Sequence, residues 1–368
     1  MALQCGIVGL PNVGKSTLFN ALTNAKALAA NYPFATKDPN VGIITVPDVR
    51  LDKLSEIVQP QNIQPTTVEI VDIAGLIKGA SKGEGLGNQF LANIREVDAV
   101  IHVVRCFDDD NVVHVDGSVN PIRDKEIIDL ELGLKDLDTV DKRIDKVARA
   151  AKAGSKDDLK ALETLNLVKS HLESGRPARE LLSNLDDDGK KLLTKDLSLL
   201  TAKPVLYVCN VDEGAIESGN AHTEAFKKSV AAENAEVILI CAGIEAQIAE
   251  MDSKEEQIEF LEMMGLSEPG VNRLITAAYK LLNLITYFTA GVKEVRAWTV
   301  RRGAKAPEAA GVIHSDFEKG FIRAEVIKYN DYVTLGSEAK VKEAGKMAVE
   351  GKEYVVTDGD IMHFRFNV

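Results

Sequence analysis

Residues 6–17 read GIVGLPNVGKST, and this stretch decides the fold. An apolar run leads into Gly9 and suits a buried strand, whereas TLFNALTNA after Ser16 has the pattern of a helix. Gly9, Gly14, Lys15 and Ser16 match the phosphate-binding loop G-x-x-x-x-G-K-[ST] in the strand–loop–helix context that this loop requires. In such a loop, Lys15 reaches the β- and γ-phosphates and the Ser16 hydroxyl binds Mg²⁺. We therefore predict an α/β P-loop nucleoside triphosphatase domain with a mostly parallel sheet.

Two further motifs follow in the order expected of such a domain. VEIVDIAG (68–75) reads as a second buried strand that ends in Asp72-x-x-Gly75. The Asp72 carboxylate can hold Mg²⁺ through a water molecule, and the Gly75 N–H can bond the γ-phosphate. The turn-rich loop 31–42 contains Thr36, which can close over Mg²⁺ when the γ-phosphate is present. We also expect the glycine-rich stretch 78–90 to be a switch that orders on nucleotide binding.

The residue that positions the attacking water is not evident from these motifs. Leu76 follows Gly75, where Ras-like enzymes carry a glutamine that orients the water. Downstream, CFDDDNVVHVDG (106–117) places His114 on a polar loop after a predicted strand, from which the imidazole could turn toward the γ-phosphate. A solvent-exposed histidine without a role in catalysis is the alternative. His114 is therefore a candidate catalytic residue beside Lys15.

The sequence NVDE (210–213) bears on which base is bound. It follows a predicted strand, where a GTP-binding protein usually carries Asn-Lys-x-Asp. An aspartate at the fourth position accepts from two guanine donors, and Glu213 is one methylene too long for that geometry, whereas Asn210 can bond either purine. Losing such a polar pair removes discrimination between bases. The sequence favours ATP, or relaxed purine use, over strict guanine recognition.

Composition bounds the class of protein. The 368 residues carry a net charge of −12, which does not indicate a nucleic-acid-binding protein, and no DNA partner is expected. No window approaches about 18 consecutive apolar residues, and the N-terminus lacks the basic region of a signal peptide, so we expect a cytoplasmic protein with no membrane span. The four scattered cysteines lack metal or redox spacing and are expected in the core.

These motifs together carry a family resemblance. GIVGLPNVGKSTLFNALT, VDIAGLIKGASKGEGLGNQFL and NVDE, with the C-terminal GVKEVRAWTV and GVIHSDFEKGFIRAEVI, resemble the YchF family of Obg-like ATPases over nearly the whole chain. The resemblance implies an ATPase that binds ATP and ADP with Mg²⁺ and associates with the ribosome, chiefly with its large subunit and rRNA. It implies Mg²⁺ ligation by Ser16 and Thr36, and a K⁺ site at Asn12. It places nucleotide contacts at Asn12, Val13, Gly14, Lys15, Ser16, Thr17 and Val211.

The chain between the third and fourth motifs is too long for a plain nucleotide-binding domain. Residues 127–172 read as two helices broken at AGSKDD (153–158), with Ser155 as the N-cap of the second, which predicts an inserted antiparallel hairpin at about 125–200. Its expected seam is Leu134, Leu137, Ile144, Ala148 and Ala151, with the polar Asp141 interrupting one seam position. Residues 142–160 hold seven basic and three acidic side chains, which suits either a solvated helix face or a docking surface for a polyanion.

From about residue 281 the sequence changes to short β-like runs, among them DYVTL (331–335). We predict residues 1–280 as the nucleotide-binding domain and residues 281–368 as the β-grasp TGS domain that the family resemblance implies, an interaction module with no catalytic groups. Together with the hairpin, this domain is the expected ribosome-binding part of the chain.

Three functional hypotheses remain open from the sequence. The first is an ATP-hydrolysing molecular switch that docks on the ribosome and regulates translation or a stress response. The second is a GTPase of the same fold that tolerates NVDE. The third is a nucleotide-stabilised ribosome-binding protein in which hydrolysis is incidental, because the water-orienting glutamine is missing.

Overall fold

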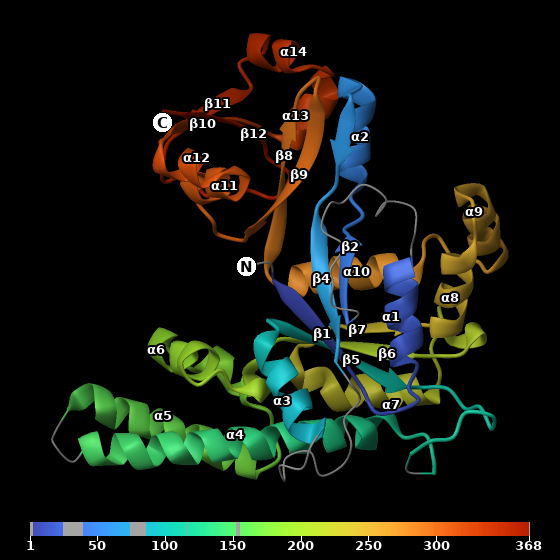
Figure 1. The fold of residues 1–368 in the computed structure, drawn as a ribbon, viewed down its shortest axis with the longest axis vertical. Coiled ribbons are helices and arrows are strands. Elements are labelled where there is room, and N and C mark those ends of the chain that lie inside the picture. The colour runs from blue at the N-terminus through green and yellow to red at the C-terminus, as the bar shows by residue number, and fades with distance from the viewer. Residues whose placement is uncertain (1–2, 25–39, 74–85, 116, 152–154, 368) are drawn as a thin grey trace. The chain divides into compact units, whose positions relative to one another are not determined.

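The structure is a computed structural model that describes residues 3–24, 40–73, 86–115, 117–151 and 155–367. Within it the chain forms two compact units. One comprises Met1–Gly42 with Glu69–Leu274, and the other comprises Ile43–Val68 with Ile275–Val368. Each unit is built around its own six-stranded sheet (Figure 1).

The sheet of the first unit carries the predicted strand–loop–helix motifs. Its strand order is β2-β4-β1-β5-β6-β7, and the pairs β1–β4, β1–β5, β5–β6 and β6–β7 are parallel. This confirms the predicted α/β P-loop fold with a mostly parallel sheet. The strands are β1 (Gln4–Val8), β2 (Val41–Thr45), β4 (Thr67–Asp72), β5 (Ala99–Arg105), β6 (Val205–Asn210) and β7 (Val237–Ile240).

Some helices of this unit begin at residues whose side chains cap the helix. Asn220, for example, accepts a hydrogen bond from the Thr223 N–H and so caps α7. The main helices are α1 (Lys15–Asn24), α3 (Leu86–Glu96), α4 (Pro121–Ala151), α5 (Lys156–Glu173), α6 (Asp187–Lys191), α7 (Ala221–Val230), α8 (Ala242–Glu250), α9 (Lys254–Met263) and α10 (Gly270–Leu281). Short helical turns are η3 (Ala178–Asn184), η4 (Leu192–Asp196), η5 (Leu200–Ala202), η6 (Glu213–Ala215) and η7 (Ala231–Glu233).

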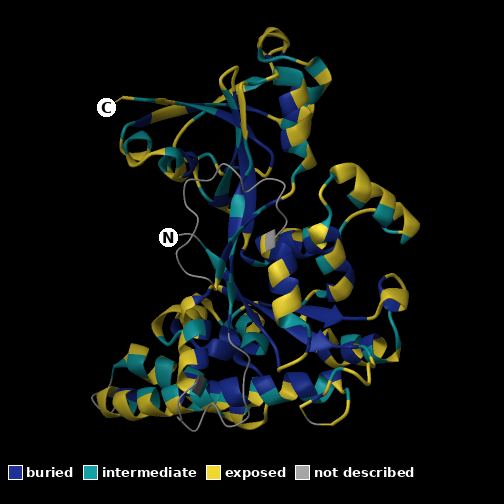
Figure 2. Ribbon diagram, turned by 45° about the vertical axis from the view of Figure 1, so that its right-hand side comes forward, coloured by how far each residue is buried: buried dark blue, intermediate teal, exposed yellow. Residues whose placement is uncertain are grey.

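Helices α4 and α5 form the predicted antiparallel hairpin, here named the arm, and they lie side by side in both ribbon views (Figures 1 and 2). Ser155 caps α5 by accepting from the Asp158 N–H, as expected. The predicted seam is partly wrong. Val140 and Val147 are buried against α5, whereas Leu134, expected in the seam, is 43% exposed.

The correct seam follows from a three-residue step. After Leu137 the apolar stripe continues to Val140, then to Ile144 and Val147, and no polar residue interrupts it. Asp141 therefore does not occupy a seam position and instead pairs with Lys169 of α5 at 2.8 Å. The sequence pattern allowed both stripes, and the position of α5 selects one.

A buried polar network joins the base of the arm to the sheet. Lys125 of α4 lies 2.6 Å from Asp129 and 2.7 Å from Glu233 of η7. Arg179 of η3 lies 2.8 Å from the same Glu233 carboxylate, which also accepts a 2.8 Å hydrogen bond from Tyr207 of β6. Because removing one partner of such a network leaves a charge buried without compensation, the network ties the orientation of α4 to the sheet.

The second unit has the strand order β11-β10-β12-β8-β9-β3, with β12 antiparallel to β10 and parallel to β8. Its strands are β3 (Asn62–Gln64), β8 (Leu284–Ala290), β9 (Glu294–Arg301), β10 (Phe321–Ile327), β11 (Met347–Glu350) and β12 (Ile361–Phe366). Its helices are α2 (Val49–Val58), α11 (Ala306–Ile313), α12 (Ser315–Lys319), α13 (Tyr329–Leu335) and α14 (Glu338–Glu343).

Two details of the second unit correct the sequence prediction. DYVTL belongs to helix α13, which ends at Gly336 in the left-handed conformation (φ 75°), and is not a strand. The segment 43–68, expected in the nucleotide-binding domain, belongs to this unit, because Leu51 and Leu54 of α2 pack in one cluster with Phe288 and Ile361. The boundary lies between residues 274 and 275, where about 280 was expected.

Candidate functional site

The P-loop connects the end of β1 to the start of α1, as the sequence predicts. Gly14 has a φ of 91°, and a Cβ atom at this position would lie 2.1 Å from Nδ2 of Asn210. A Cβ on Gly9 would lie 2.8 Å from the carbonyl oxygen of Val103. Both positions therefore require glycine, because a side chain would collide with a neighbouring atom at each, and Gly14 also has a backbone conformation that other residues rarely adopt. This tight backbone turn is what a phosphate-binding loop needs in order to present its N–H groups.

The structure brings together Lys15 and Asp72, which the sequence assigned to different motifs. Lys15 opens α1, Asp72 ends β4, and the Nζ atom of Lys15 forms an ion pair with Oδ1 of Asp72. The two side chains are 10% and 20% exposed, so the pair is largely buried. Ser16, the next residue in α1, is exposed. An amine and a carboxylate thus meet where β4 ends and α1 begins, and the residue that carries the predicted hydroxyl ligand directly follows the lysine in the chain.

Two predicted ligands lie outside the described residues. Thr36 and Gly75 both belong to segments that the structure does not describe, as do Leu76 and most of the expected switch at 78–90. Among the described residues, no group of three or more His, Cys, Asp or Glu side chains is placed to hold a metal ion. Ser16 and Asp72 nevertheless supply oxygen donors of the type that Mg²⁺ prefers, so the residues present fit that ion.

Asn210, the last residue of β6, connects three segments. Its side chain is 5% exposed; Nδ2 donates to the Val13 carbonyl at 2.9 Å, and Oδ1 accepts from the Ala242 N–H at 3.0 Å. The expected base-reading amide therefore also supports the P-loop and the start of α8. An asparagine amide has a second N–H donor and a second oxygen lone pair, so these contacts leave capacity for a purine.

Of the three residues that follow Asn210, the first is buried and the next two are exposed. Val211 is 2% exposed, and its N–H bonds the Ile240 carbonyl at 2.9 Å. Asp212 and Glu213 are exposed where the chain enters η6. Glu213, the residue that replaces the guanine-reading aspartate, is therefore accessible at the end of β6.

His114 is not the exposed loop histidine that was the alternative reading. It is buried, and its Nε2 lies 2.8 Å from Oδ2 of Asp124 in the first turn of α4, with the two side chains 4% and 2% exposed. Arg123 contributes a second contact to Asp124 at 3.2 Å. Because the side chain is buried, a role in positioning water would require the His114 imidazole to become accessible. Asp124 was not predicted from the sequence, although an acidic side chain in the first turn of a helix is a recognisable signal.

The comparisons with known proteins agree with this geometry. Residues 4–148 match the family model described as 50S ribosome-binding GTPase, and residues 284–367 match a model of the YchF GTPase C-terminal region, described as a protein of unknown function. The Ribosome-binding ATPase YchF of Bacillus subtilis (strain 168) is 58% identical over 370 residues, which cover all of both chains. The Escherichia coli O157:H7 protein of that name is 56% identical over 368 residues, again all of both chains.

The chain belongs to the YchF family. A solved structure of the Schizosaccharomyces pombe YchF GTPase superposes with a TM-score of 0.89 at 40% identity, covering 99% of this chain and 97% of that one. The resemblance stated from the motifs is thereby confirmed. None of the helices in the described parts of this YchF-family chain is both long and apolar enough to cross a membrane.

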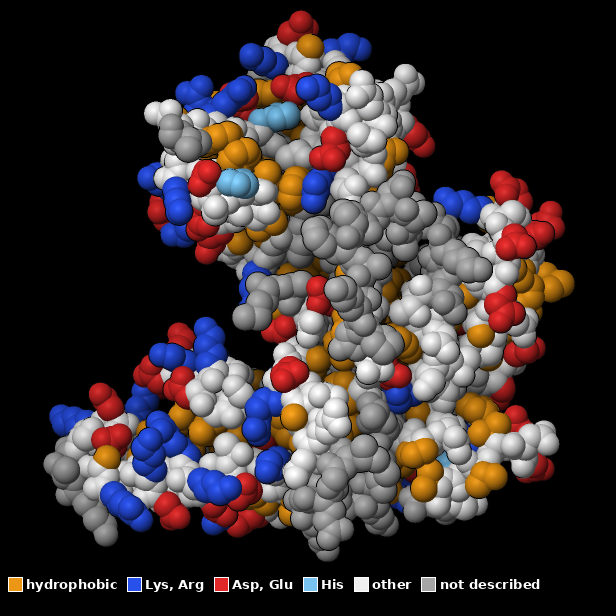
Figure 3. All heavy atoms as spheres, in the orientation of Figure 1, with side chains coloured by type: hydrophobic (Ala, Val, Ile, Leu, Met, Phe, Trp, Pro, Cys, Tyr) orange, Lys and Arg blue, Asp and Glu red, His pale blue; other side chains and the backbone are white. Residues whose placement is uncertain are grey.

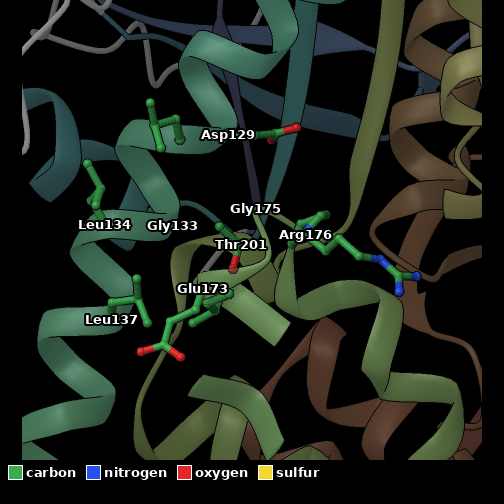
Figure 4. Close-up of a pocket in the computed structure, with 11 residues that line it drawn as sticks. Asp129, Gly133, Leu134, Leu137, Glu173, Gly175, Arg176 and Thr201 are labelled. Carbon is green, nitrogen blue, oxygen red and sulfur yellow. The ribbon is translucent and has the colours of Figure 1, made fainter. Parts of the chain in front are cut away.

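A pocket of about 120 Å³ lies at the base of the arm (Figure 4). Leu130, Leu134 and Leu137 of α4 line it together with residues that follow α5, and Leu130 is 57% exposed. Its volume is well below the ~300 Å³ at which pockets for small ligands begin. It contains none of the predicted nucleotide residues, so it is not the nucleotide site.

Most of the basic cluster expected on the arm is exposed, although Arg143 is half-buried and Lys152 lies outside the described residues. Lys and Arg side chains gather along α4 and α5 on the face shown in Figure 3. Acidic neighbours pair with some of them: Lys142 lies 2.8 Å from Asp138, and Lys160 lies 2.6 Å from Asp186. Lys146 and Arg149 are exposed. The local positive charge is therefore partly compensated.

The cysteines are all buried, as expected from their apolar surroundings. Burial, with a smaller contribution from the charge of Asp98, raises the pKa of the Cys5 thiol to about 12. A thiol with so high a pKa is a poor nucleophile at neutral pH. Cys5 therefore belongs to the core.

Proposed function

We propose that this chain is an ATP-hydrolysing, ribosome-associated molecular switch of the cytoplasm that regulates translation or a stress response. One observation carries the proposal: the P-loop lysine faces the Asp72 carboxylate, while the base-reading segment carries NVDE in place of Asn-Lys-x-Asp. The printed names of the Bacillus subtilis and Escherichia coli relatives, ribosome-binding ATPase, support it.

The nucleotide site uses the residues around the P-loop. The amides of Asn12 to Thr17 surround the phosphates, Gly75 bonds the γ-phosphate, and Asn210 and Val211 face the base. Ser16, Thr36 and, through water, Asp72 hold Mg²⁺. Bound Mg²⁺ supplies positive charge that stabilises the phosphate oxygens during transfer.

The ion pair between Lys15 and Asp72 gives these two residues alternative partners. Lys15 turns from Asp72 to the β- and γ-phosphates when a triphosphate binds, and it neutralises charge that grows on the phosphate oxygens. His114, paired with Asp124, orients the attacking water once its buried imidazole becomes accessible. No covalent intermediate forms, because water attacks the γ-phosphate directly.

The ribosome is the proposed macromolecular partner, through the rRNA of its large subunit. The exposed lysines and arginines of the arm supply the charge that a phosphate backbone requires, and the second unit, as a TGS domain, supplies a further contact surface. Asn12, which is exposed in the P-loop, is the proposed K⁺ ligand.

A titration tests the proposal. ATP, GTP, ADP and GDP are titrated into the chain with Mg²⁺, with and without large ribosomal subunits, while hydrolysis is followed in parallel. We expect ATP and ADP to bind more tightly than GTP and GDP, and ribosomes to change affinity or turnover. Tighter binding of GDP than of ADP would instead support a GTPase. A Lys15→Ala variant that loses hydrolysis but keeps ribosome-linked effects would support incidental hydrolysis.

A further inference from the structure

Arg105, the last residue of β5, is among the largest fully buried side chains, at 2% exposure. Its guanidinium donates three hydrogen bonds, all to backbone carbonyls of the segment that follows. Nε bonds Phe107 at 3.1 Å, Nη2 bonds Asp109 at 3.1 Å, and Nη1 bonds Val112 at 2.8 Å. The guanidinium carbon also lies 4.6 Å from the centre of the Phe107 ring. One side chain thus sets the path of residues 107–112.

Packing alone does not account for an arginine at this position. Within the described residues Arg105 forms no ion pair with a carboxylate, in contrast to the buried Arg179, which contacts Asp129 and Glu233. Burying a cation without a counter-charge is costly, and an apolar side chain could fill the same space without that cost. The fork of N–H donors is what distinguishes arginine from a lysine or a methionine here.

The segment that Arg105 shapes touches the P-loop. Val113 follows the last carbonyl that Arg105 holds, and its own carbonyl accepts a 3.1 Å hydrogen bond from Nδ2 of Asn12. Asn12 has a φ of 63°, a left-handed conformation that is uncommon outside glycine, although asparagine tolerates it better than most residues, so a contact of its side chain helps to hold it. Val13, the next residue, receives separate support from Asn210. Among the described residues, Asn12 and Val13 of the P-loop thus each have a side-chain contact with a distant segment, and the contact at Asn12 depends on the 107–113 segment.

We propose that Arg105 is a positioning residue for the nucleotide site. It holds residues 107–113 so that the Val113 carbonyl supports Asn12, and through Asn12 it keeps the P-loop in the shape that binds phosphate. Arg105 does not touch the nucleotide. This inference rests on the proposed function, because its effect is measured as nucleotide affinity at the P-loop.

The test measures affinity of a fluorescent ATP analogue and of ADP for the full chain, together with kcat, KM and the thermal midpoint. Arg105→Lys keeps the charge and loses the fork. We expect it to weaken nucleotide binding about fivefold, the effect of losing one supporting hydrogen bond, with kcat at saturation changed less than twofold. Arg105→Gln, which keeps N–H donors without the charge, is a second variant should the lysine variant not fold.

Coupling to Asn12 separates positioning from general stability. If Arg105 acts through Asn12, adding Arg105→Lys to Asn12→Ala weakens binding no further. Arg179→Lys is the matched control, a buried arginine held by carboxylates, and it is expected to lower the thermal midpoint without changing nucleotide affinity. Unchanged affinity in a folded Arg105 variant, or effects of Arg105 and Asn12 that multiply, would overturn the inference. Absence of nucleotide binding in the parent chain would overturn the proposed function as well.

Discussion

Gly14→Ala is the most direct test of the nucleotide site. An alanine at φ 91° costs about 1–2 kcal/mol relative to its preferred conformations. Its Cβ would lie 2.1 Å from Nδ2 of Asn210, so the Asn210 side chain must move and give up its bonds to Val13 and Ala242. Two buried hydrogen bonds contribute about 2 kcal/mol in total.

The sum is about 3–4 kcal/mol, which corresponds to a loss of roughly 10²- to 10³-fold in nucleotide affinity if all of it acts on the P-loop. The assay is calorimetric titration of Mg-ATP and ADP, with thermal unfolding measured on the same samples. Combining Gly14→Ala with Asn210→Ala tests the mechanism. Because the displaced side chain is then absent, Gly14→Ala should cost about 2 kcal/mol less in the Asn210→Ala background.

Gly133→Ala is the matched control. Gly133 lies inside α4, and a Cβ there would meet no atom within 4 Å. Since alanine favours a helix by up to about 1 kcal/mol over glycine, this variant should be slightly more stable and bind nucleotide as before. Affinity of Gly14→Ala within twofold of the parent, or an equal penalty with and without Asn210, would refute the reasoning.

Three further predictions concern stability and partner binding. Leu54→Ala, at a fully buried position of α2, should destabilise the second unit by about 2–5 kcal/mol and leave nucleotide affinity unchanged. Hydrogen exchange measures the stability of each unit, and titration measures the affinity. An equal loss of amide-hydrogen protection in both units would contradict the prediction. Burial lowers the pKa of His102 to about 4 from an ordinary 6.5, so the unfolded chain takes up a proton that the folded chain resists. About 3 kcal/mol of stability should therefore be present above pH 6.5 and be lost as the pH falls toward 4, and denaturant titrations of His102→Gln should lack this component. Reversing two exposed charges of the arm, Lys146→Glu with Arg149→Glu, should weaken ribosome co-sedimentation about tenfold and lower its salt dependence by about two counter-ions, with basal ATP hydrolysis unchanged. The same loss of co-sedimentation on reversing the charge of the exposed Lys228 of α7 would show that the effect is not specific to the arm.

Much of the fold could be predicted from local sequence patterns. The P-loop, the buried strands and the two arm helices were predictable, because a glycine-rich turn, an apolar run and a capping serine act over a few residues. The predictions were wrong where a sequence pattern was compatible with two structures. The arm seam could follow Val140 or Asp141, and DYVTL could be a strand or a helix, so only the packing partner decided each case.

The site shows the same division. Lys15 and Asp72 were assigned from separate motifs, and the parallel pairing of β1 with β4 places them together. Arg105 and Asp124 were not predicted, since the Arg105 partners are backbone carbonyls, which carry no signature in the sequence, and the His114 partner depends on where α4 begins.

The amino-acid sequence by itself determined that this chain has a P-loop, a lysine and serine for phosphate and metal, and an altered guanine-reading motif. Only the tertiary structure decided that Asn210 supports Val13 from 197 positions away, that Arg50 of α2 reaches Asp358 across 308, and that residues 43–68 complete the second unit. The physical reason is that motifs are set by contacts along a short stretch of chain, whereas these interactions exist only after distant segments have packed together.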